Sequence, residues 1–224
     1  MNSIFAPSVI ITLFLTSILF VTAADDEVAK LANKVTVVKE SDMWLRVTVP
    51  FNLVSHPRMT SSGNSRPTSI SDAYNPEFIN NLKVKVYLCF ANEYNKKLFR
   101  AQKLPDSQFY QYYSSEITFN CVKVDRATKN AHFLFPSLIA ERDGFLGSYV
   151  NLVGYAVQIS AEGLKLEMSN DIAFEKYRDE NILGKFLEQA VNNSSKNEGI
   201  LVPAYKVSAN YLDATGIPIL TESR

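Results

Sequence analysis

The residues best suited to chemistry are few and lie apart along the chain. Histidine occurs only twice, at His56 and His132, and neither has a companion at the helical or hairpin spacing of metal ligands. No nucleophile elbow, P-loop or glycine-rich dinucleotide turn is present. The Glu141-Arg142-Asp143 stretch is typical of a local ion pair or a helix end, and a carboxylate pair for glycoside cleavage lacks support. We therefore predict no catalytic residue, no metal site and no cofactor.

The two cysteines, Cys89 and Cys121, are the next reactive groups. An even pair in an oxidising compartment is typical of a disulfide, and closing the intervening loop would stabilise the fold by roughly 3–4 kcal/mol in the chain-entropy model. Two reduced cysteines that pack as small apolar side chains are the alternative. Both residues fall in expected strands, and the sequence leaves open whether those strands are neighbours.

Four aromatic rings gather in five positions: Phe109, Tyr110, Tyr112 and Tyr113. In an extended segment Phe109 and Tyr113 share one face, while Tyr110 and Tyr112 share the other. In a helical turn Phe109, Tyr112 and Tyr113 share a side. Neither geometry points every ring to one surface, so packing inside the fold is the leading interpretation. A contact patch for a glycan or a protein is the alternative, because tyrosine combines an apolar body with a polar tip.

The N-terminal residues 1–23 are typical of a secretory signal peptide. An apolar run from Val9 to Val21 leads to small residues ending at Ala23, although no Lys or Arg precedes it. An uncleaved membrane anchor is the alternative reading of the same run. We expect a secreted, periplasmic or outer-envelope location and no membrane span once the leader is removed. The 23 basic and 23 acidic residues balance, which argues against nucleic acid as a partner.

Beyond the leader the dominant hydrophobic period is two, which predicts strands with one buried face. The clearest runs are 45–53, 84–90 and 153–159, and Glu162-Gly163 predicts a hairpin turn before 164–168. Further strands are expected at 35–38, 115–125 and 204–212, with a long loop over 55–75. Short strands without regular intervening helices predict a mainly β, antiparallel sandwich, formed by 24–224 as one domain.

Two helical segments interrupt the strands. Apolar residues recur at helical spacing from Asp179 to Asn192, with Asp179 as N-cap, and we expect this amphipathic helix to dock on the sheet core. A partner-binding helix is the alternative. A shorter helical turn is expected from Pro136 to Glu141, because proline suits the first helical position.

Three stretches carry a family resemblance: WLRVTVPF (44–51), LFPSLIAERDG (134–144) and VGY (153–155). They resemble a small family of secreted, pilus-like proteins from mucin-degrading Verrucomicrobia. The resemblance implies an immunoglobulin-like sandwich and an association with a type IV pilus gene neighbourhood. It supplies no catalytic or cofactor-binding residues.

We therefore expect a non-enzymatic secreted or envelope protein that contacts protein partners, associated with a pilus. The alternative is a carbohydrate-binding module or adhesin that uses the aromatic run.

Overall fold

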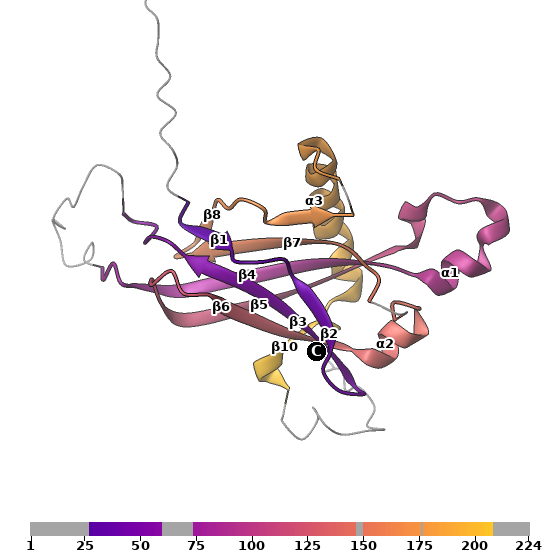
Figure 1. The fold of residues 1–224 in the computed structure, drawn as a ribbon, viewed down its shortest axis with the longest axis horizontal. Helices are drawn as coiled ribbons and strands as arrows, with labels where there is room; N and C mark the ends of the chain where they lie inside the picture. The colour runs from indigo at the N-terminus through magenta and orange to yellow at the C-terminus, as the bar shows by residue number, and fades with distance from the viewer. Residues whose placement is uncertain (1–26, 60–73, 147–149, 176, 208–224) are drawn as a thin grey trace, which may run out of the picture.

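The computed structural model describes residues 27–59, 74–146, 150–175 and 177–207. The expected signal peptide, 1–23, lies outside these residues, as does most of the expected loop at 55–75. The described chain is mainly β and forms two antiparallel sheets, which confirms the expected class (Figure 1). The longest strands of both sheets run along the long axis of the molecule. The described residues also form three α-helices, which lie outside the two sheets.

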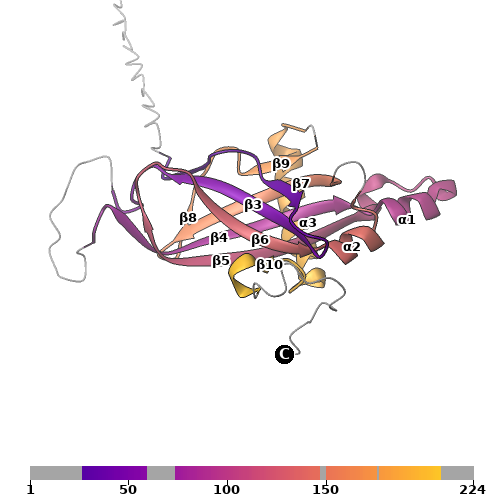
Figure 2. The ribbon, with the colours of Figure 1, turned by 60° about the horizontal axis from the view of Figure 1, so that its bottom comes forward.

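The first sheet has the order β1-β3-β6-β10, and β2 also pairs with β3. Its strands are β1 (Ala29–Leu31), β2 (Thr36–Lys39), β3 (Trp44–Leu53), β6 (Lys129–Pro136) and β10 (Val202–Pro203). The second sheet has the order β5-β4-β7-β8, and β9 also pairs with β7. Its strands are β4 (Phe78–Ala91), β5 (Tyr110–Lys123), β7 (Leu152–Ala161), β8 (Leu164–Leu166) and β9 (Ile172–Phe174). Figure 2 shows the two layers after rotation.

The alternating side chains expected to point inward do form the core. One buried cluster holds Leu45, Val47, Val49, Phe51 and Leu53 of β3 together with Val84, Val86, Leu88 and Phe90 of β4. Aromatic rings fill the end of this core near the helices. Phe90 stacks on Phe145 with ring centroids 4.9 Å apart, and Tyr113 meets Phe135 edge-on at 4.8 Å. Such pairs contribute about 1 kcal/mol each beyond the area they bury.

The period of two breaks once in β4, at Asn81, which adopts a left-handed backbone with φ of 51°. Ile79 and Leu82 are therefore both buried although two residues, rather than one, lie between them. On the paired strand β5, Phe119 and Val122 both pack on the core in the same way. This change of face leaves Cys121 exposed.

The candidate disulfide between Cys89 and Cys121 is not formed, and both cysteines are free. They do lie on neighbouring strands, but Cys89 pairs with Tyr112 while Cys121 pairs with Asn80. Nine positions of strand therefore separate them, a distance of roughly 30 Å at the rise of an extended chain. A disulfide requires Cα atoms within about 7 Å.

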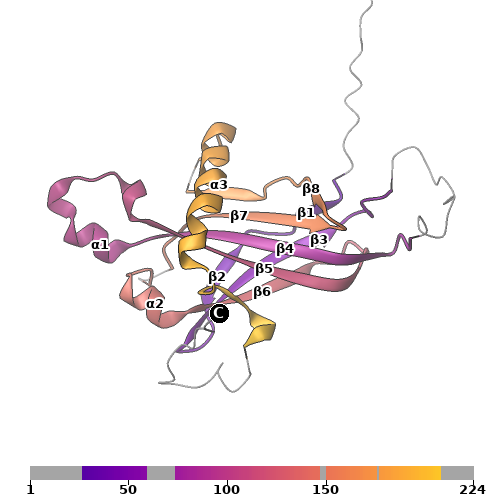
Figure 3. The same ribbon diagram turned by 180° about the vertical axis from the view of Figure 1, so that it is seen from behind.

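The helix α3 (Glu180–Ser194) docks on the outer face of the second sheet, as expected (Figure 3). The Asp179 side chain accepts hydrogen bonds from the Asn181 and Ile182 amides, which confirms the N-cap. Phe186 and Ala190 pack into a second buried cluster, made with Tyr87, Cys89, Tyr112 and Ala156. Cys89 thus points outward from the sandwich core and is covered by α3.

Two other expectations need adjustment. The short helix α2 (Ser137–Arg142) begins one residue later than expected, with Pro136 as its N-cap. The expected strand at 204–212 is wrong at its start: β10 ends at Pro203, and Ala204–Lys206 forms a 3-10 turn, η5, closed by the Val207 amide donating to the Ala204 carbonyl. Residues 208–212 lie outside the described chain. No helix among the described residues has the length and apolarity needed to cross a membrane.

Candidate functional site

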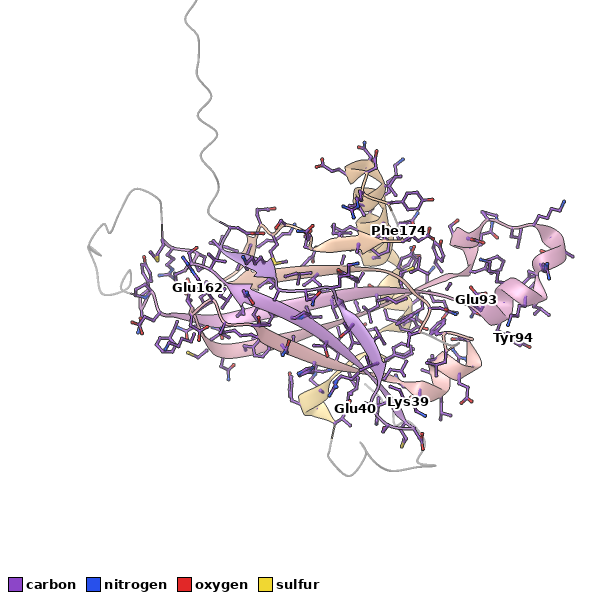
Figure 4. The ribbon with its side chains drawn as sticks, in the orientation of Figure 1. Lys39, Glu40, Glu93, Tyr94, Glu162 and Phe174 are labelled. Atoms are coloured by element: carbon purple, nitrogen blue, oxygen red, sulfur yellow. The ribbon has the colours of Figure 1, made fainter. Side chains whose placement is uncertain are left out.

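The chain between β4 and β5 leaves the sandwich and forms a projecting arm, residues 92–109. It contains α1 (Glu93–Leu98) and two 3-10 turns, η2 (Arg100–Gln102) and η3 (Asp106–Phe109). Figure 1 shows the arm extending from one end of the sandwich, beside α2. In Figure 4 the labelled Glu93 and Tyr94 lie at this end, far from Glu162 at the opposite end. The helix α1 buries none of its residues.

Asn92 fixes the base of the arm. Its amide donates to the Phe109 carbonyl at 2.8 Å, which ties the two ends of the excursion together. Its side-chain oxygen accepts the Asn95 amide at 2.8 Å and so caps α1. Asn92 is itself buried, so these bonds are shielded from water and hold the arm in one position.

Two further contacts brace the arm. Lys96 and Asp106 form an ion pair at 3.0 Å, which links α1 to the returning turn η3. Gly144, after α2, has φ of +71°, and a Cβ there would come within 3.1 Å of the Tyr94 amide nitrogen. Glycine therefore suits this position twice, by its backbone and by its lack of a side chain. The first turn of α1 therefore packs against the residue that follows α2.

The tip of the arm, Lys97–Lys103, is exposed at all seven positions. Leu98 leaves 64% of its surface in water, and Phe99 beside it is exposed too. Lys97, Arg100 and Lys103 form no ion pair with any described residue. No acidic residue occurs from Tyr94 to Pro105. The tip thus carries both apolar and cationic side chains, and none of its residues is buried against the rest of the described chain.

Two hollows flank the Lys96–Asp106 ion pair at the base. One, of about 270 Å³, is lined on its polar side by Glu93, Tyr110, Asn151 and Glu175 in addition to the pair. The other, of about 130 Å³, lies under the tip and is lined by Phe99, Arg100, Lys103 and Leu104 as well as the pair. We call them the anionic hollow and the cationic hollow.

Tyr110 and Glu175 join two elements across the anionic hollow. The Tyr110 hydroxyl donates to Glu175 Oε1 at 2.5 Å, which links the start of β5 to the residue after β9. Burial, and then the hydrogen bond to Glu175 and the negative charge of that residue, raise the pKa of Tyr110. The hydroxyl therefore stays a hydrogen-bond donor at neutral pH, and Glu175 keeps its second oxygen for another partner.

The aromatic run does not form the exposed patch that was the alternative interpretation. Phe109, Tyr112 and Tyr113 are buried, and Tyr110 is half-buried in the anionic hollow. Tyr113 packs in the core, whereas Tyr112 lies under α3 and donates from its hydroxyl to Gln189 at 3.1 Å. Because β5 begins at Tyr110, successive rings point to opposite faces, and both faces are covered here.

The histidines occupy structural positions. His56 is buried and stacks on Tyr74 with centroids 4.6 Å apart, and its Nδ1 lies 3.1 Å from the Arg58 amide as acceptor. Burial lowers its pKa. His132 lies on β6 with Nδ1 3.2 Å from the Thr48 hydroxyl. Across 27–59, 74–146, 150–175 and 177–207, no three His, Cys, Asp or Glu side chains are grouped to hold a metal ion.

The sequence did not single out the arm tip. Its apolar residues, Leu98 and Phe99, are adjacent and follow neither a helical stripe nor a period of two, so they carry no pattern of burial. The usable signal was the run of Lys96, Lys97, Arg100 and Lys103 without any acidic residue between Tyr94 and Pro105.

Comparison with known proteins finds no matching family model, no matching curated protein and no matching solved structure. The resemblance to the pilus-like family therefore stays a prediction from the sequence.

Proposed function

We propose that this chain is a non-enzymatic secreted or cell-envelope protein that works by protein contact through its arm, in association with a pilus. The observation that carries the proposal is the arm tip, where Leu98 and Phe99 stand exposed on a segment that is tied firmly at its base. The pilus association and the location come from the family resemblance and the leader.

The contacts at the base of the arm favour a role of the arm in binding another protein. Ordering a loop or a side chain on binding costs about 0.5–1.5 kcal/mol for each immobilised side chain. Asn92 and the Lys96–Asp106 pair reduce this cost because they hold the backbone in place before a partner arrives. The exposed residue types also suit an interface, since aromatic and arginine side chains dominate binding energy in protein contacts.

We also propose that the sandwich is immunoglobulin-like. The support is the order of the strands other than the short β2, β9 and β10: β1-β3-β6 against β5-β4-β7-β8. With strands lettered along the chain, this is A-B-E against C′-C-F-G, which is the order of immunoglobulin-like sandwiches that place C′ beside C and lack strand D. The loop between C and C′ is then the arm, and loops at sandwich ends are common binding sites in this architecture.

Glycan binding through the aromatic run has less support as an alternative. A sugar platform needs ring faces open to solvent, whereas Phe109, Tyr112 and Tyr113 are buried.

The test is a co-isolation experiment in the native cells with the tagged full-length protein and a chemical crosslinker. We expect Leu98→Ser with Phe99→Ser to remove most crosslinked partner proteins, because the apolar part of the contact is lost. Leu164→Ser is the matched control, since Leu164 is equally exposed but lies on the hairpin between β7 and β8. Equal recovery of partners with both variants would argue against the arm, and turnover of a small substrate would argue against a non-enzymatic role.

A further inference from the structure

The end of the sandwich that carries the arm is divided into two regions of opposite charge. The Lys96–Asp106 ion pair lines both hollows and separates them. On one side lie the carboxylates of Glu93 and Glu175, and on the other the cations of Arg100 and Lys103. Building on the proposed contact function, we infer that this end binds a second copy of the chain about a twofold axis near the Lys96–Asp106 pair.

Symmetry makes such a divided surface complementary to itself. A twofold axis on the dividing line places the cationic half of one copy opposite the anionic half of the other, and the reverse contact forms at the same time. A surface of a single charge sign would instead repel its own copy. Because the 23 basic and 23 acidic residues balance, the net charge of the chain does not oppose this association.

Within one molecule the two halves do not pair with each other among the described residues. Lys96, at the boundary, pairs with Asp106 at 3.0 Å. Arg100 and Lys103 form no ion pair with any described residue. Glu175 uses one oxygen to accept from Tyr110 and keeps the other, so it can accept from a cation of the second copy.

Apolar groups complete the proposed interface. Phe99 and Leu104 line the cationic hollow, and Leu152 and Val153 line the anionic hollow. A hollow of about 270 Å³ has room for an inserted arginine or lysine side chain. Burial of the apolar walls supplies affinity, while the charges set the register of the two copies.

Sedimentation velocity of the full-length protein over a range of concentrations tests this inference. We expect a monomer–dimer equilibrium that weakens as salt rises from ~50 to ~500 mM, because screening acts on exposed charges. Arg100→Glu with Lys103→Glu should weaken the dimer by about tenfold or more, and Glu93→Lys with Glu175→Lys should do the same. Lys30→Glu with Lys165→Glu is the matched control and should leave the dimer unchanged, since both lysines are exposed elsewhere.

Mixing the two charge-reversed variants separates lost charge complementarity from lost folding. One variant then has two anionic halves and the other two cationic halves, so we expect a heterodimer although each variant alone dimerises more weakly than the wild-type protein. Circular dichroism confirms that each variant is folded. The inference is overturned if the wild-type protein stays monomeric at ~50 mM salt, if the control reversal weakens the dimer equally, or if the mixture forms no heterodimer. Monomeric protein whose arm still captures a different protein would overturn this inference and leave the proposed contact function standing.

Discussion

At the scale of single residues, the two cysteines lie in different environments. Cys89 lies under α3, and burial raises the pKa of its thiol to about 12. Cys121 is exposed on β5, paired with Asn80 beside the left-handed Asn81, where the side-chain alternation of β4 and β5 breaks. Sequence alternation alone cannot reveal a left-handed residue inside a strand, so the sequence does not predict which cysteine is exposed.

The cysteines should differ in reactivity. In the folded protein near pH 8 we expect an alkylating reagent to label Cys121 and to leave Cys89 unlabelled, because only the thiolate reacts and Cys89 is both protonated and covered. Both should be labelled after unfolding in denaturant. Peptide mapping by mass spectrometry reads out the result, and a Cys89–Cys121 crosslinked peptide from the native protein would contradict the register.

Asn92 should contribute measurably to stability through its cap. Asn92→Ala removes the acceptor for the Asn95 amide, and we expect the free energy of unfolding to fall by about 1 kcal/mol or more, as for other N-caps. Urea denaturation measures the change. Asn181→Ala, at an exposed position in the first turn of α3, is the control and should change stability by less than about 0.5 kcal/mol. Equal effects would show that the cap does not secure the arm.

At the scale of elements, the sequence was informative where burial repeats regularly. The periods along 45–53, 84–90 and 153–159 correspond to β3, β4 and β7, and the turn at Glu162-Gly163 joins β7 to β8. The helix from Asp179 was predictable because its cap and its stripe agree. The sequence did not predict the arm because α1 buries none of its residues. A periodic hydrophobic pattern arises only where one face of an element is buried.

The helix α3 offers a direct test of its docking. Phe186 is buried against Tyr112 and Phe174, with ring centroids 6.2 and 4.7 Å away. Phe186→Ala should lower the free energy of unfolding by about 3–4 kcal/mol through the cavity it leaves. Val191→Ala, on the exposed side of the same helix, should cost less than about 1 kcal/mol. Comparable losses for both variants in urea denaturation would place the helix differently on the sheet.

At the scale of the whole molecule, we expect the free energy of unfolding to depend on pH. Burial lowers the pKa of both His56 and His132 below the ordinary 6.5. Below that value the unfolded chain binds more protons than the folded one, so the free energy of unfolding should fall as pH drops from about 7 to about 5.5. Urea denaturation at several pH values measures the slope. Replacing both histidines with glutamine should flatten it, and a rise in stability over the same interval would contradict the assigned shifts.

The described chain forms two packed sheets, with α3 on the outer face of the second sheet and the arm projecting from one end. The central claim is that this end, and not the opposite end, meets other proteins. Tyr94 on α1 and Leu164 on the far hairpin match in exposure, at 61% and 60%, so they make a controlled pair.

The most direct measurement places a photo-crosslinking amino acid at either position in the full-length protein within its own cells. We expect discrete protein crosslinks from position 94 and few from position 164. Crosslinks of equal yield and identity from both positions, or crosslinks from position 164 alone, would contradict it.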